Sequence, residues 1–239
     1  MKRFLTGVAC LAFVCFPAVA CEILVAAASD LAPLEPELKQ VLPECRFRFS
    51  FGSSGALARQ IEAGADFDVY LAASRSFVDQ LVRGGNADSA QVVPYARGRI
   101  ALWSRSGLKW QDLRRADRIA IANPALAPYG LAAKQALQKQ GLWEAVRRKI
   151  VFGENIRQAW QFAETGNVDA GIVSWSLVYQ KGGQLLPESW HAPIEQTGVI
   201  PKRSAHPADA RRFLDALVSA AGQKMLSSHG LEPVRLTSP

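Results

Sequence analysis

The chain has 239 residues, of which 49% are hydrophobic and 21% are charged, and its formal net charge is +7. This composition excludes a disordered chain, and no stretch after residue 20 has the roughly 18 uncharged apolar residues that a membrane-spanning helix needs. The charge permits an anionic partner, but no basic stripe interleaved with aromatic residues indicates nucleic acid.

Residues 1–20 have the layout of a secretory signal peptide. Lys2 and Arg3 precede a short apolar core, and Ala18 and Ala20 offer small residues before a cleavage point. We therefore predict export to the periplasm. Removal of the segment would leave 219 residues, a net charge of +5 because two bases are lost, and two of the four cysteines.

The remaining chain alternates β-rich runs with amphipathic helical stretches. The run 23–28 is continuously apolar, which is typical of a strand buried on both faces. In chain order, strands are expected at 23–28, 46–51, 68–73, 99–104, 118–123, 149–152, 170–175 and 193–200. Helices are expected at 31–42, 54–63, 75–83, 129–140 and 156–165, with two more in 207–228 broken near Gly222.

This alternation predicts an α/β protein with mostly parallel sheets flanked by helices. Eight strands are many for one open sheet, and all six tryptophans fall between 103 and 190. We therefore predict two lobes. The first lobe combines 21–97 with 193–239, and the second is 98–192.

Four junctions share one pattern, in which a strand ends, a small or polar residue follows, and a helix begins. A helix start leaves unpaired backbone N–H groups and a partial positive charge, which together suit an oxyanion. Such strand ends are also where ligands bind in open α/β sheets. The alternative at each junction is a simple helix cap. The junctions lie at 28–30, 52–55, 127–130 and 154–156.

Five runs cover most of the chain after residue 20: AAASDL (26–31), FGSSGALARQIEAGADFDVYLAA (51–73), ANPALAPYGLAAKQAL (122–137), ENIRQAW (154–160) and DAGIV (169–173). In order and spacing they resemble the periplasmic molybdate-binding proteins of ABC importers, which are type II periplasmic binding proteins. The resemblance implies two α/β lobes joined by two crossing segments that act as a hinge. It implies capture of molybdate, and also tungstate, in the interlobe cleft for delivery to a membrane permease, without catalysis.

The resemblance also implies a set of anion-binding residues. The hydroxyls of Ser29 and Ser54 and the backbone N–H groups of Asp30, Tyr129 and Ile156 stand where the family binds the oxyanion. Molybdenum would be held only as this oxyanion, with no resident cofactor and no separate metal site, by a monomer.

Some members use a tyrosine after the Gly-Ile-Val strand. Ser174 stands there, so the sequence resembles the branch that uses the tyrosine of Pro-Tyr-Gly, here Tyr129.

Two features depart from the family pattern. The Asp30 carboxylate would lie beside a dianion, and two like charges ~4 Å apart repel by about 4 kcal/mol at an effective dielectric near 20. We therefore expect this carboxylate to point away and to cap the helix. A helix that begins at residue 31 would lose one backbone hydrogen bond at Pro36. The alternative is a helix that begins later in the chain.

Cys21 and Cys45 each precede a predicted strand, and consecutive strands of a βαβ unit are usually neighbours. Because an exported compartment is oxidising, we predict a disulfide between them. The alternative is a lipid on Cys21.

Three other functions remain open. One is the binding of another tetrahedral oxyanion, such as sulfate or phosphate. The second is a periplasmic hydrolase or transferase, which is disfavoured because no Ser-His-Asp, Cys-His or carboxylate pair stands at usable junctions. The third is the effector module of a regulator, against which the export signal argues.

Overall fold

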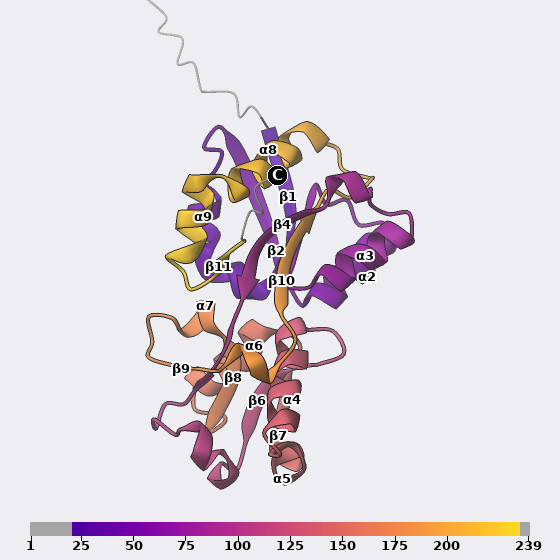
Figure 1. Cartoon of the computed structure of the whole chain (residues 1–239). Helices are drawn as coiled ribbons and strands as arrows, with labels where there is room; N and C mark the ends of the chain where they lie inside the picture. The colour runs from indigo at the N-terminus through magenta and orange to yellow at the C-terminus, as the bar shows by residue number, and fades with distance from the viewer. Residues whose placement is uncertain (1–20, 235–239) are drawn as a thin grey trace, which may run out of the picture.

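A computed structural model of the chain describes residues 21–234. The predicted signal peptide, 1–20, lies outside the described residues. The chain forms two lobes stacked end to end, each with one sheet flanked by helices (Figure 1). None of the helices between residues 21 and 234 is long and apolar enough to cross a membrane.

The first lobe is built on a six-stranded sheet with the order β11-β4-β10-β3-β1-β2. The strands β1, β2 and β3 run parallel, whereas β10, β4 and β11 join antiparallel. The bounds are β1 (Cys21–Ala28), β2 (Cys45–Gly52), β3 (Val69–Ala72), β4 (Val93–Gly98), β10 (Ile194–Val199) and β11 (Glu232–Pro233).

The second lobe is built on a five-stranded sheet with the order β7-β6-β8-β5-β9. Here β7, β6 and β8 are parallel, and β5 runs antiparallel to β8 and β9. The bounds are β5 (Ile100–Trp103), β6 (Ile119–Ala122), β7 (Ile150–Gly153), β8 (Ala170–Ser174) and β9 (Gln184–Leu185).

The two-lobe α/β architecture is confirmed, and its sheets are mixed. The chain leaves the first lobe through β4 and returns through β10, and these two strands pair antiparallel beside the hinge. The sequence did not predict β4, β9 or β11. Pro94 and Pro233 weaken the strand signal of β4 and β11, since proline cannot donate to a ladder. The lobe boundaries at 97/98 and 192/193 stay a prediction.

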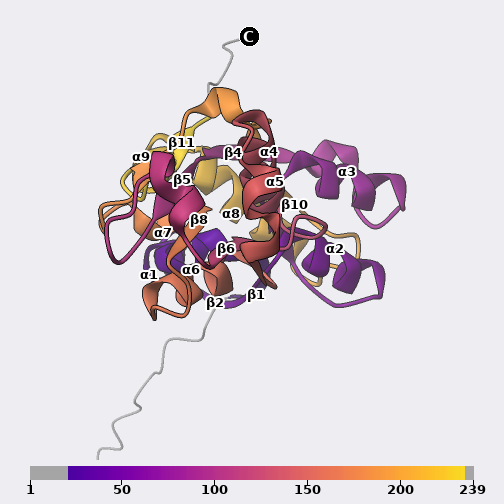
Figure 2. The same cartoon turned by 90° about the horizontal axis from the view of Figure 1, so that it is seen from below.

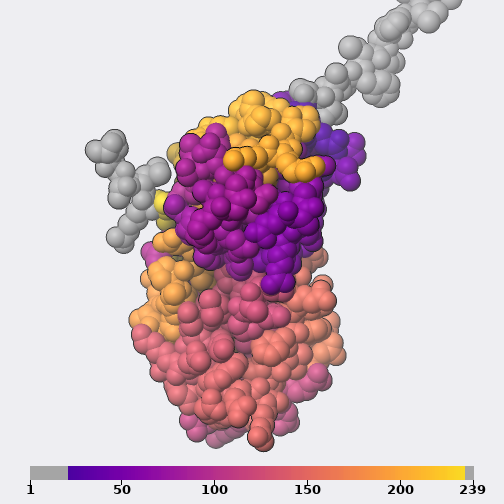
Figure 3. Space-filling view, turned by 90° about the vertical axis from the view of Figure 1, so that its right-hand side faces the viewer, coloured from indigo at the N-terminus to yellow at the C-terminus, as the bar shows by residue number. Residues whose placement is uncertain are grey.

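The helices of the first lobe lie beside its sheet, and the last two come from the C-terminal part of the chain, drawn in yellow at the top of Figure 3. They are η1 (Ser29–Leu34), α1 (Glu35–Leu38), α2 (Ser54–Glu62), α3 (Arg75–Arg83), η2 (Ser89–Gln91), α8 (Pro207–Val218) and α9 (Ala220–Ser227). Those of the second lobe are η3 (Trp110–Arg115), α4 (Pro128–Lys139), α5 (Trp143–Val146), η4 (Arg147–Lys149), α6 (Ile156–Glu164), α7 (Trp175–Val178) and η5 (Glu188–Trp190).

Two helix predictions were wrong in detail. The segment predicted as one helix at 31–42 is a 3-10 turn, η1, followed by the short α1. Pro36 lies in the first turn of α1, where a missing N–H costs nothing. The C-terminal helices break at Ser219 rather than near Gly222, because the Ser219 side chain accepts a bond from the Gly222 N–H and so caps α9.

The disulfide between Cys21 and Cys45 is present, as predicted. The two residues are register partners at the start of the parallel strands β1 and β2, and their Cα atoms lie 4.7 Å apart. The bridge therefore closes the end of the sheet opposite to the strand ends that face the second lobe.

Candidate functional site

The four strand-to-helix junctions meet where the two lobes touch. The backbone N–H of Gly55, at the start of α2, donates to the carbonyl of Leu126 just before α4, over 2.8 Å. The turn η1 packs against α6 and α7, two helices of the second lobe that are labelled in the view from that lobe (Figure 2). Junctions far apart in the sequence thus come together where the two lobes meet.

Ser29 supplies an unused hydroxyl at this cleft. The residue is 2% exposed, and its Oγ has no hydrogen-bond partner among the residues that the structure describes. Most buried hydroxyls in proteins are paired, so this one calls for a ligand or an ordered water. Its place at the end of β1 comes from the apolar strand before it and the η1 turn after it.

Ser54 offers a second hydroxyl, at the first position of α2. Its Oγ accepts a bond from the Ala73 N–H at 3.0 Å, and it is 1% exposed. A hydroxyl that accepts one bond still has its own hydrogen to donate. The Tyr70 hydroxyl donates to the Ser54 carbonyl at 2.7 Å and so fixes this turn.

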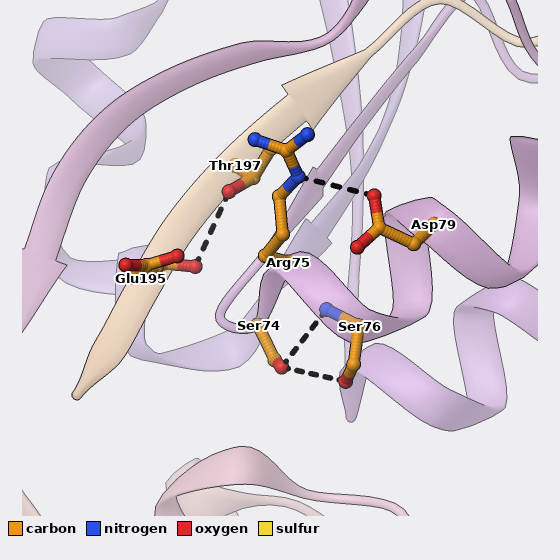
Figure 4. Close-up of polar contacts among 6 residues, drawn as sticks. All are labelled: Ser74, Arg75, Ser76, Asp79, Glu195 and Thr197. Atoms are coloured by element: carbon orange, nitrogen blue, oxygen red, sulfur yellow. Dashed lines mark hydrogen bonds and ion pairs between the residues drawn. The ribbon is translucent and has the colours of Figure 1, made fainter. Parts of the chain in front are cut away.

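The helix starts differ in whether a side chain caps them. The Ser74 hydroxyl caps α3 by accepting from the Ser76 N–H at 3.3 Å, and it shares a 2.8 Å bond with the Ser76 hydroxyl (Figure 4). No side chain of the described residues caps η1, α2 or α4. In α2 the Gly55 N–H is used by the Leu126 carbonyl, and Pro128 at the start of α4 has no N–H; the other first-turn N–H groups of these helices have no side-chain cap and are candidate donors to an anion.

At the fourth junction a cap is present but leaves donors free. Asn155 accepts from the Gln158 N–H at 3.0 Å and caps α6. The N–H groups of Ile156 and Arg157 precede this cap bond, and no intrahelical acceptor exists for them. Ile156 therefore has a backbone N–H without an intrahelical acceptor, and its role as an anion donor stays a prediction.

The Asp30 carboxylate does not cap a helix, so that expectation was wrong. Its Oδ2 accepts from the Tyr129 hydroxyl at 2.8 Å and from Gln196 Nε2 at 2.5 Å. The side-chain hydroxyl of Tyr129 is thus engaged within the protein. A role for the Tyr129 backbone N–H as an anion donor stays a prediction.

Asp30 is the charged group of the site, and it is fully buried. Burial raises the pKa of its carboxyl to about 6, although the hydrogen bonds from Tyr129 and Gln196 oppose the rise. Burial and the nearby Asp30 charge also raise the pKa of the Tyr129 hydroxyl, so that Tyr129 stays a neutral donor. The neutral side chains of Tyr129 and Gln196 therefore donate to the Asp30 carboxyl, whose raised pKa makes it easier to protonate than a solvated aspartate.

Comparison with known proteins identifies the family. A model of the bacterial extracellular solute-binding proteins matches residues 23–232. The chain belongs to this family. The molybdate-binding protein ModA of Rhodobacter capsulatus is 33% identical over 94% of each chain. That of Azotobacter vinelandii is 34% identical and covers 89% of this chain and 90% of its own.

The solved structure of the Azotobacter vinelandii periplasmic molybdate-binding protein has the same fold, with a TM-score of 0.82 at 27% identity, covering 87% of this chain and 98% of that one. The sulfate-binding protein SubI of Mycobacterium tuberculosis shares the fold alone, with a TM-score of 0.72 at 17% identity over 90% of this chain and 88% of its own. This solute-binding protein is therefore extracytoplasmic and not an enzyme.

The sequence missed several residues of this solute-binding protein's cleft. Gln196 and Tyr95 lie on the crossing strands and reach the Asp30 carboxylate or its partners. Ser176 donates to the Asp30 carbonyl at 2.8 Å and shares a bond with Ser174. One signal was available: a glutamine inside the otherwise β-rich run 193–200 is an unusual residue to bury.

Proposed function

We propose that this solute-binding protein captures molybdate between its lobes and delivers it to the membrane permease of an ABC importer. The observation that carries the proposal is the buried hydroxyl of Ser29, which has no partner among the described residues and lies where helix starts without side-chain caps meet between the lobes. The relatives named molybdate-binding protein support this choice of anion.

The proposed donors are the hydroxyls of Ser29 and Ser54 and the N–H groups of Asp30, Tyr129 and Ile156. All five residues are buried, with exposed fractions of 3% or less. Buried hydroxyl and amide donors suit a tetrahedral dianion, because they stabilise its charge without a formal counter-ion. Tungstate, which has the same shape and charge, should bind as well.

The proposal includes what the protein needs and where it acts. We infer a monomer without a resident cofactor, exported to the periplasm by residues 1–20. Because Cys21 is in a disulfide, its sulfur is not available for a lipid. Selectivity over sulfate would come from the width of the cage, since the same donors suit both anions and molybdate is the larger.

The test is a titration of tryptophan fluorescence with molybdate, tungstate, sulfate and phosphate. Trp160 lies in α6 and Trp175 begins α7, and η1 packs on both helices, so closure should change their emission. Saturation by molybdate and tungstate alone is expected. Saturation by sulfate and not by molybdate would contradict the substrate.

Serine variants test the site itself. Ser29→Ala and Ser54→Ala should each weaken molybdate binding by about 1.5–3 kcal/mol, the range for hydrogen bonds to charged groups. Ser228→Ala is the control, because that hydroxyl bonds to the Met225 carbonyl at the end of α9. Unchanged affinity in both cleft variants would exclude these residues as donors.

A further inference from the structure

Gln196 is a fully buried amide on a crossing strand of the hinge. It lies in β10, and its exposed fraction is 0%. The pairing of β10 with β4 shifts register between Gln196 and Thr197. An irregularity of this kind re-aims side chains and is frequent beside functional sites. Here it accompanies a polar side chain that enters the contact between the lobes.

The Gln196 amide joins residues from both lobes. Nε2 donates to Asp30 Oδ2 at 2.5 Å and to the Tyr129 hydroxyl at 2.9 Å. Oε1 accepts from the Tyr95 hydroxyl at 2.8 Å. Asp30 belongs to η1 of the first lobe, Tyr129 to α4 of the second, and Tyr95 to the other crossing strand, β4. Both amide hydrogens and the amide oxygen are therefore used.

The Tyr129 hydroxyl approaches the backbone of a crossing strand closely. A Cβ on Gly98, which lies on β4, would be 2.2 Å from the Tyr129 hydroxyl. The hydroxyl therefore rests directly on the backbone of the crossing strand. The Asp30 carboxylate is held at Oδ2 by Tyr129 of α4 and Gln196 of β10, while its buried Oδ1 has no hydrogen-bond partner among the described residues.

We propose that Gln196 is a positioning residue for the anion site. Its amide holds the Asp30 carboxylate toward the hinge, so that the backbone N–H of Asp30 and the hydroxyl of Ser29 face the cleft. The same amide ties Tyr129 of the second lobe into this arrangement when the lobes meet. The inference rests on the proposed function, because the anion is the ligand that a freely turning carboxylate would repel.

Gln196→Leu removes the amide at similar size and leaves the Asp30 carboxylate with one donor. The molybdate dissociation constant, measured by tryptophan fluorescence, should rise about tenfold or more, as for a broken buried hydrogen bond to a charged group. Thr197→Val is the matched control. Thr197 is equally buried on the same strand, and among the described residues its hydroxyl hydrogen-bonds only to the Glu195 carbonyl, at 3.4 Å (Figure 4).

Gln196→Glu separates positioning from simple packing. The titratable groups that face Gln196 are Asp30, Tyr95 and Tyr129, and burial raises the pKa of both tyrosines, which leaves only Asp30 to titrate near neutrality. Two adjacent carboxyls share one proton readily but resist losing both. The ratio of the molybdate affinity of Gln196→Glu to that of the wild type should therefore fall steadily from about pH 5 to about pH 8. A packing defect would give a ratio that does not change with pH.

The outcomes separate this inference from the proposed function. A wild type that binds none of the anions contradicts both. A wild type that binds molybdate, with Gln196→Leu equal to it, contradicts the positioning role alone, as does a flat pH ratio for Gln196→Glu. If Gln196→Leu does not fold, Tyr95→Phe decides, since it removes only the bond to Oε1. That variant should bind severalfold more weakly, and unchanged affinity would overturn the inference.

Discussion

Asp30 is the residue whose charge the anion site must accommodate. Its carboxyl has a pKa of 3.8 when solvated, and burial raises the folded-state value to about 6. The native state therefore holds this proton more tightly than the unfolded chain. The group contributes stability that is complete below about pH 3.8 and is lost as the pH rises through about 6. The loss amounts to about 3 kcal/mol.

Asp30→Asn should remove this dependence. Relative to the wild type, the free energy of unfolding of the ligand-free variant should rise by up to about 3 kcal/mol between pH 4 and pH 7 and then stay level. Urea denaturation at several pH values measures it. Asp66→Asn, which removes an exposed carboxylate, is the control. Parallel stability curves for the wild type and Asp30→Asn would show that this carboxyl does not titrate as inferred.

At the scale of elements, the α4 junction depends on a close approach between helix and strand. A Cβ on Gly130, in the first turn of α4, would lie 2.0 Å from the Ala122 carbonyl oxygen at the end of β6. Backbone atoms in a strand cannot move aside as the end of a flexible side chain can. Gly130→Ala should therefore lower the free energy of unfolding by about 1–3 kcal/mol or more. Because α4 must shift, the Tyr129 N–H moves too, and molybdate binding should weaken.

Urea denaturation and the fluorescence titration check both effects. Gly84→Ala is the matched control, since its φ of −75° suits alanine and its nearest neighbour is the Asn86 side chain. Equal stability of Gly130→Ala and Gly84→Ala would contradict the close packing.

The junctions could be predicted from the sequence because each is local. Ser29, Ser54 and Ile156 follow strands and begin helices within a few residues, so the pattern of residue types carries the information. The Asp30 contacts could not be predicted. Tyr129 and Gln196 lie 99 and 166 positions away in the chain, and only the meeting of two lobes brings them together. For the same reason, the sequence suggested a local cap for a carboxylate that has distant partners.

At the scale of the whole molecule, the lobes make direct contacts of their own. The bond from Gly55 to Leu126 and the bond from Ser176 to the Asp30 carbonyl both cross the cleft, each at 2.8 Å. Ala28 and Ala73 of the first lobe also belong to the apolar core of the second. Part of the free energy of closure therefore comes from the protein, and the anion has to supply only the remainder.

Ser176→Ala tests this division. Loss of a neutral hydrogen bond of about 0.5–1.5 kcal/mol should lower the closed-to-open ratio of the ligand-free protein about 2- to 12-fold. The radius of gyration from small-angle X-ray scattering should then increase, and saturating molybdate should restore it. The affinity for molybdate should fall in proportion to the decrease in the fraction of ligand-free protein that is closed. Ser228→Ala, whose hydroxyl bonds within its own lobe, should match the wild type in both measurements. A weaker affinity with an unchanged radius would mean that Ser176 acts on the anion site and not on closure.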